Sequence, residues 1–169
     1  IVTMCKKIKQ QMLSLGSNGK LTLSINPFIP KPFTPFQWSS MNRKNEIEVK
    51  LKQIRESLRM VKGIEILAES PKEACIQATL ARGDRRLAQV LYRSHSLGGY
   101  KFWNRAMQEC GLEEAFYINR ERDFAEILPW QIINIGIDQH YLSAEREKAK
   151  QEIYTPPCLP GCTRCGVCK

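Results

Sequence analysis

Residues 21–38, LTLSINPFIPKPFTPFQW, contain the pattern that decides the fold. From Leu21 to Ile25 apolar and polar residues alternate, which is the period of two of a β-strand. A helical pattern over residues 1–15 precedes this strand, and a loop rich in glycine and asparagine separates the two. The order helix, loop, strand is typical of an α/β protein.

The rest of this stretch, residues 26–38, is rich in proline and in aromatic side chains. Each proline fixes its own φ and biases the preceding residue toward extended geometry, so we expect a stiff, non-helical loop. The phenylalanine and tryptophan side chains between the prolines leave two interpretations open. The loop is either an extended segment held on the core by its aromatic residues or a loop that faces a ligand.

A second α/β pattern follows from residue 45 onward. The spacing of the apolar residues predicts a helix that ends at Gly63, and IEILAES (64–70) predicts a second strand. The apolar stripe of the helix consists of Ile47, Leu51, Ile54, Leu58 and Val61. A strand, a crossover helix and a strand form a βαβ unit with parallel strands. Such a unit needs neighbouring strands.

The sequence beyond Ser70 predicts mainly helices. Ser70 and Asp84 are expected to cap two short helices, and Asp138 is expected to cap a final, mostly polar helix. The expected helices cover residues 71–83, 84–99, 100–111 and 139–153. The first three should pack as a small bundle.

The chain carries a formal net charge of +9 that is concentrated in its first third. Residues 1–60 hold 11 Lys and Arg against 3 Glu, whereas residues 61–169 hold 15 basic against 14 acidic residues. A basic region can bind nucleic acid, so RNA is a candidate partner. The charges lie along helix faces without interleaved aromatic residues, which favours an ordinary solvated surface.

Composition and the first residues of the chain predict a folded protein, its compartment and an upstream part of the polypeptide. Of the 169 residues, 43% are hydrophobic and 25% are charged, as in folded globular proteins. No stretch reaches the ~18 apolar residues of a membrane span, and no signal-peptide pattern is present, so we expect a cytoplasmic protein without a membrane partner. Ile1 lies inside a helical pattern that has no start signal. We therefore expect an upstream part of the same polypeptide as a partner of this chain.

The last twelve residues, CLPGCTRCGVCK, hold four of the seven cysteines. The spacing C-x3-C-x2-C-x2-C lets four sulfurs converge on one metal ion or cluster, with Cys158, Cys162, Cys165 and Cys168 as ligands. Structural zinc sites usually pair two hairpins across a longer interval, so the compact run favours an iron–sulfur cluster, with zinc as the alternative. A structural clip without metal is also open. The other cysteines lie in helical patterns and are expected to be buried thiols: Cys5, Cys75 and Cys110.

Four segments of the chain carry a resemblance to a known family. They are SINPFIPKPFTPFQW (24–38), ARGDRR (81–86), LPW (128–130) and CTRCGVC (162–168). Together they resemble the C-terminal part of a radical S-adenosylmethionine (SAM) protein group whose members often carry a cobalamin-binding-like domain before the radical barrel. The resemblance implies three regions: the last βα elements of a partial (β/α)6 barrel (1–68), a helical region (69–153) and a cysteine-rich metal-binding tail (154–169).

The resemblance also implies where the cofactors would bind. Loops at the carboxyl ends of barrel strands build the active site, so loop 26–38 would form part of its wall, with Thr34 and Gln37 near SAM or substrate. SAM cleavage needs a [4Fe-4S] cluster held by an upstream C-x3-C-x2-C motif, and the full-length enzyme would use SAM and, in this group, cobalamin. The same spacing recurs in the tail, but Cys168 adds a fourth ligand that leaves no iron free for SAM. We therefore expect an auxiliary cluster there, and no activity from this chain alone.

Overall fold

Two units make up residues 1–167, the part of the chain that the computed structural model describes. Unit 1 comprises Ile1–Phe28 and Asn42–Cys75, and unit 2 comprises Ile29–Met41 together with the residues from Ile76 onward. The described residues form seven α-helices, one short 3-10 helix and a parallel pair of strands, so the predicted helix-rich α/β class is confirmed. Within residues 1–167, no helix has both the length and the apolar character needed to cross a membrane.

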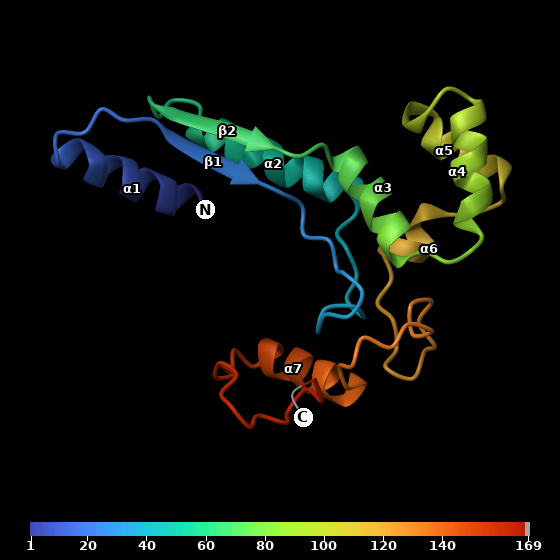
Figure 1. Cartoon of the computed structure of the whole chain (residues 1–169). Helices are drawn as coiled ribbons and strands as arrows, with labels where there is room; N and C mark the ends of the chain where they lie inside the picture. The colour runs from blue at the N-terminus through green and yellow to red at the C-terminus, as the bar shows by residue number, and fades with distance from the viewer. Residues whose placement is uncertain (168–169) are drawn as a thin grey trace. The chain divides into compact units, whose positions relative to one another are not determined.

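Unit 1 is a parallel βαβ unit preceded by a helix (Figure 1). Its elements are α1 (Val2–Ser14), β1 (Leu21–Ile25), α2 (Lys44–Leu58) and β2 (Ile64–Ala68). The strands pair in register, with Leu21 opposite Ile64 and Ile25 opposite Ala68. This arrangement confirms the strand, helix and strand that the sequence pattern predicted.

One face of the strand pair is covered and the other is open. Along both strands half-buried apolar residues alternate with exposed ones, namely Thr22, Ser24, Glu65 and Leu67. Helix α2 contacts β2 and buries three residues of its predicted apolar stripe, namely Ile47, Leu51 and Leu58. Helix α1 contacts both β1 and α2. The sheet of unit 1 therefore has helices on one face and solvent on the other.

A buried lysine ties α1 to the loop before β1. Lys9 is 5% exposed, and its Nζ donates a hydrogen bond to the carbonyl of Gly19 over 2.5 Å. Gly63, which precedes β2, has φ +76°, and a Cβ at this position would lie 2.7 Å from Lys9 Nζ. Glycine is favoured here by the positive φ, and a side chain at this position would also displace the Lys9 ammonium group.

Unit 2 contains most of the helices, and their bounds differ in places from the prediction. They are α3 (Pro71–Arg82, in unit 2 from Ile76), α4 (Leu87–Ser96), the 3-10 helix η1 (Tyr100–Phe102), α5 (Trp103–Glu109), α6 (Glu114–Ile118) and α7 (Gln139–Lys150). The predicted cap Asp138 is confirmed, because its carboxylate accepts from the His140 N–H over 2.8 Å. The prediction that Asp84 caps the next helix is wrong. Its carboxylate accepts from the Arg86 N–H in a turn, and α4 begins at Leu87.

The core of unit 2 joins the proline-rich residues 26–38, here called the proline segment, to the last helix. Trp38 packs with Leu128, Trp130 and Leu142, and Phe124 meets the Trp38 ring edge-on at 4.8 Å between centroids. The Trp38 carbonyl also accepts from the Arg122 N–H over 2.8 Å. These contacts favour the first interpretation of the proline segment, an extended stretch held on the core.

Gly83, between α3 and α4, has no room for a side chain. A Cβ there would lie 2.0 Å from Leu87 Cδ1 and 2.7 Å from the Thr79 carbonyl oxygen. We expect Gly83→Ala to lower the free energy of unfolding of unit 2 by about 1–3 kcal/mol, the usual cost of overpacking. All three tryptophans lie in unit 2, so tryptophan fluorescence during urea unfolding measures this change.

The matched control for this substitution is Arg85→Ala in the same turn. Arg85 is exposed, so its truncation should leave the free energy of unfolding within about 0.5 kcal/mol of wild type. Equal midpoints for Gly83→Ala and wild type would contradict the packing argument.

Candidate functional site

The predicted ligand-contacting residues of the proline segment make hydrogen bonds inside unit 2. Gln37 is fully buried, and its Oε1 accepts from Trp130 Nε1 over 2.7 Å and from the Phe33 N–H over 3.2 Å. The Thr34 hydroxyl donates to the Lys31 carbonyl over 2.8 Å. Both side chains thus stabilise the conformation of their own segment, and a contact with SAM or substrate stays a prediction.

The structure describes three of the four cysteines in the tail. Cys158 is exposed, Cys162 and Cys165 are half-buried, and these three form no disulfide within the described part of the chain. Cys168 lies outside the described residues. Among residues 1–167, no three Cys, His, Asp or Glu side chains form a group that could hold a metal ion. The four-cysteine metal site therefore stays a prediction.

Arg164 shapes the loop that carries these cysteines. Its Nη2 donates to the carbonyls of Pro156 and Pro157 over 2.9 and 3.2 Å, and its Nε donates to Cys162 Sγ over 3.2 Å. The Asp138 N–H donates to the Cys165 carbonyl over 2.9 Å, which joins the tail to the start of α7. The tail, which belongs to unit 2, is therefore folded back on itself and joined to the start of α7.

The Cys162 thiol has the electrostatic surroundings of a metal ligand. The Arg164 side chain, then the Arg164 backbone and then the neighbouring Cys158 thiol lower the pKa of Cys162 to about 7. Metal ions bind the thiolate, so a lowered pKa favours the ligating form at neutral pH. Iron–sulfur clusters and zinc both take cysteine thiolates, so the lowered pKa does not distinguish between them.

Two of the three cysteines outside the tail are buried as their helical patterns predicted, whereas the same prediction is wrong for Cys110. Cys5 and Cys75 are each 2% exposed. Cys110 is half-buried, at the end of α5.

The sequence did not reveal a cluster of buried arginines in unit 2. Arg82 is fully buried, and its Nε donates to the Tyr117 carbonyl over 3.1 Å. Arg122 is 3% exposed, and its Nη2 donates to the Arg82 carbonyl over 3.0 Å. Arg120 binds Glu126 through two hydrogen bonds of 2.7 and 2.6 Å. The ARGDRR segment thus has its first arginine at the centre of a charged network.

Burial and mutual repulsion act on the arginine cluster. Desolvation, then the charges of Arg122 and Arg120, lower the pKa of Arg82 to about 10, so this guanidinium remains charged at neutral pH. Burial, then the charge of Arg120, also lowers the pKa of Arg122. No local sequence signal distinguishes these arginines from solvated ones, because their burial depends on distant segments.

Comparison with known proteins gives one distant similarity. The chain is 31% identical over 91 residues to the uncharacterized protein MJ0966 of Methanocaldococcus jannaschii, and the match covers 54% of this chain and 18% of that protein. The chain thus spans less than a fifth of the length of this relative. No family model matches the chain. No solved structure matches it.

The lowered pKa of Cys162 can be tested without metal. We expect Arg164→Met to raise it toward the ~8.5 of an ordinary thiol, because the substitution removes the cation and the N–H donor. The measurement is the pH dependence of Cys162 alkylation in metal-free protein, followed by peptide mass spectrometry. Arg105→Met, which removes an exposed arginine paired with Glu109, is the control and should leave the midpoint unchanged. An unchanged midpoint in Arg164→Met would contradict the assignment.

Proposed function

We propose that this chain is the C-terminal portion of a radical SAM iron–sulfur enzyme. In this proposal unit 1 supplies the last βα elements of a partial (β/α)6 barrel, and the cysteine tail supplies an auxiliary metal site. The proposal rests on the resemblance carried by four segments of the sequence and on one structural observation, the open βαβ unit. The substrate and the reaction are not part of it.

The observation that carries the proposal is the incomplete parallel sheet of unit 1. Parallel sheets are normally covered on both faces, and sheets usually have about four to six strands. Here two parallel strands expose one face, on which Leu67 is 54% exposed. In the proposed barrel, upstream strands of the same polypeptide pair with this sheet, and the open face lines the barrel interior.

The proline segment has the chain position that an active-site wall requires. It follows the carboxyl end of β1, the end at which α/β barrels build their sites. The hydrogen bonds of Thr34 and Gln37 stiffen this segment. We propose that the stiff segment forms part of the wall beside SAM or substrate.

The tail is proposed as an accessory site rather than the SAM-cleaving centre. Cys158, Cys162, Cys165 and Cys168 would hold an iron–sulfur cluster, and four cysteine ligands leave no iron open to SAM. In such a site Arg164 would donate to a ligand sulfur and partly balance the negative charge of the thiolates.

The surface of unit 1 gives less support to a zinc-dependent RNA-binding module. Several of its exposed lysines are paired with glutamates, as in Lys20 with Glu65 and Lys44 with Glu48. RNA binding that falls steeply with salt would favour this alternative over the enzyme.

Anaerobic reconstitution with iron and sulfide tests the metal part of the proposal. We expect about four iron atoms per chain and visible charge-transfer absorption, because four thiolates are the usual ligand set of such clusters. Cys162→Ala and Cys165→Ala should lose both signals, whereas the control Cys110→Ala, outside the tail, should keep them. Uptake of zinc by a colourless protein would contradict the cluster.

The radical SAM assignment has a separate test in the sequence. It predicts a C-x3-C-x2-C motif upstream in the full-length polypeptide, and the absence of this motif would contradict the assignment.

A further inference from the structure

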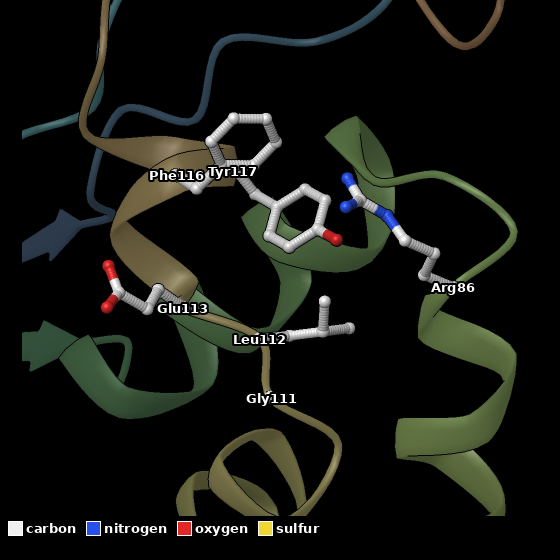
Figure 2. Close-up of a pocket in the computed structure, with 6 residues that line it drawn as sticks. All are labelled: Arg86, Gly111, Leu112, Glu113, Phe116 and Tyr117. Atoms are coloured by element: carbon white, nitrogen blue, oxygen red, sulfur yellow. The ribbon is translucent and has the colours of Figure 1, made fainter.

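A cavity of about 250 Å³ lies beside Arg86 in unit 2 (Figure 2). Its lining consists of Arg86, Gly111, Leu112, Glu113, Phe116 and Tyr117. Figure 2 shows the Tyr117 hydroxyl and the Arg86 guanidinium directed toward one another, whereas the Glu113 carboxylate points away from them. One end of the cavity is therefore formed by two hydrogen-bond donors and an aromatic surface.

The Tyr117 hydroxyl is buried without a hydrogen-bond partner. Tyr117 is 1% exposed, and within residues 1–167 its oxygen has no partner. A buried hydroxyl without a partner destabilises the folded state, and a phenylalanine would fill nearly the same space without that cost. The hydroxyl is therefore suited to an acceptor that comes from outside the described chain.

Arg86 presents a second donor, held in a fixed orientation. Its Nε and Nη2 bind the Asp84 carboxylate over 3.0 and 2.7 Å, and its guanidinium lies 5.6 Å from the Phe116 ring centroid and 5.8 Å from that of Tyr117. Asp84 engages Nε and Nη2, so Nη1 is left for another acceptor. A ligand that binds both donors must offer oxygen acceptors.

The charge near the cavity favours an anionic acceptor. Arg82 binds the backbone carbonyl of Tyr117, and Arg122 binds the carbonyl of Arg82. The guanidiniums of Arg82, Arg86, Arg120 and Arg122 outnumber the nearby carboxylates of Asp84, Glu113 and Glu126, so the charge around the cavity is positive. Arg82 Nη2 and Arg122 Nε are also buried without partners in the described part of the chain.

We infer that this cavity binds a phosphoryl group. The Tyr117 hydroxyl and Arg86 Nη1 donate to its oxygens, and Arg82 and Arg122 supply positive potential from behind the cavity wall. A phosphoryl group offers three strong acceptor oxygens to these donors, whereas a carboxylate offers two. This site is independent of the radical SAM proposal and would stand if the tail bound zinc.

The test is a titration of the full chain with inorganic phosphate at neutral pH, with ionic strength held constant by chloride. Circular dichroism gives the melting temperature Tm, and ³¹P NMR line broadening gives binding directly. We expect phosphate to raise Tm, because a ligand that binds only the folded state stabilises it. Sodium acetate at equal ionic strength should have a smaller effect. An equal effect of acetate would overturn the phosphoryl assignment, and the absence of any phosphate effect would overturn the site.

Tyr117→Phe separates a ligand site from a structural role. The variant should bind phosphate at least about tenfold more weakly, because a hydrogen bond to a charged group is lost. Its Tm without phosphate should equal or exceed that of wild type, since the unpartnered hydroxyl is gone. Tyr92→Phe, at a 76% exposed tyrosine on α4, is the matched control and should change neither value. A lower Tm without phosphate, or unchanged phosphate binding, would overturn the inference.

Arg86→Gln provides an independent test of the second donor. We expect phosphate binding to weaken at least about tenfold, because the variant loses a charged donor. Arg105→Gln, which removes an exposed arginine paired with Glu109 on α5, is the control and should bind phosphate as wild type does. Equal losses in both variants would indicate an adventitious ion only, held by general surface charge.

Discussion

The arrangement of unit 2 depends on the buried guanidinium of Arg82. Its Nε bonds the Tyr117 carbonyl, its Nη1 makes a longer bond of 3.5 Å to the Pro30 carbonyl, and its own carbonyl accepts from Arg122. Burying a charge is costly unless hydrogen bonds replace its hydration. Helix α6 and the proline segment must therefore be in place together with the end of α3, because their carbonyl oxygens accept from the Arg82 guanidinium.

The same network connects stability with the proposed phosphoryl site. An arginine cluster with excess positive charge and unpartnered N–H groups is not the arrangement that packing alone would favour, since apolar residues fill such space at lower cost. Proteins accept such costs mainly where polar groups serve binding or catalysis. The Tyr117 hydroxyl and Arg86 lie at the edge of the network. A ligand that accepts hydrogen bonds from them would offset part of the unfavourable free energy of burying these groups.

Unit 1 and the tail each have a feature that the proposed enzyme would complete. The strand pair of unit 1 has an open face, and in the proposed barrel that face would line the interior while further strands of the same polypeptide pair with the sheet. The tail holds the Cys162 thiol, whose surroundings favour the thiolate, and the proposed metal would neutralise that charge.

The sequence by itself determined the local elements, because their signals lie within a few residues. Alternation defined β1, the apolar stripe defined α2, and the Asp138 carboxylate caps α7 as its position predicted. The five-residue α6 escaped prediction because it is too short to show a helical period. Only the tertiary structure decided that Gln37 bonds a tryptophan 93 residues away and that Arg82 and Tyr117 are buried. Burial of a polar side chain depends on which distant segments surround it, and no local pattern in the sequence records that.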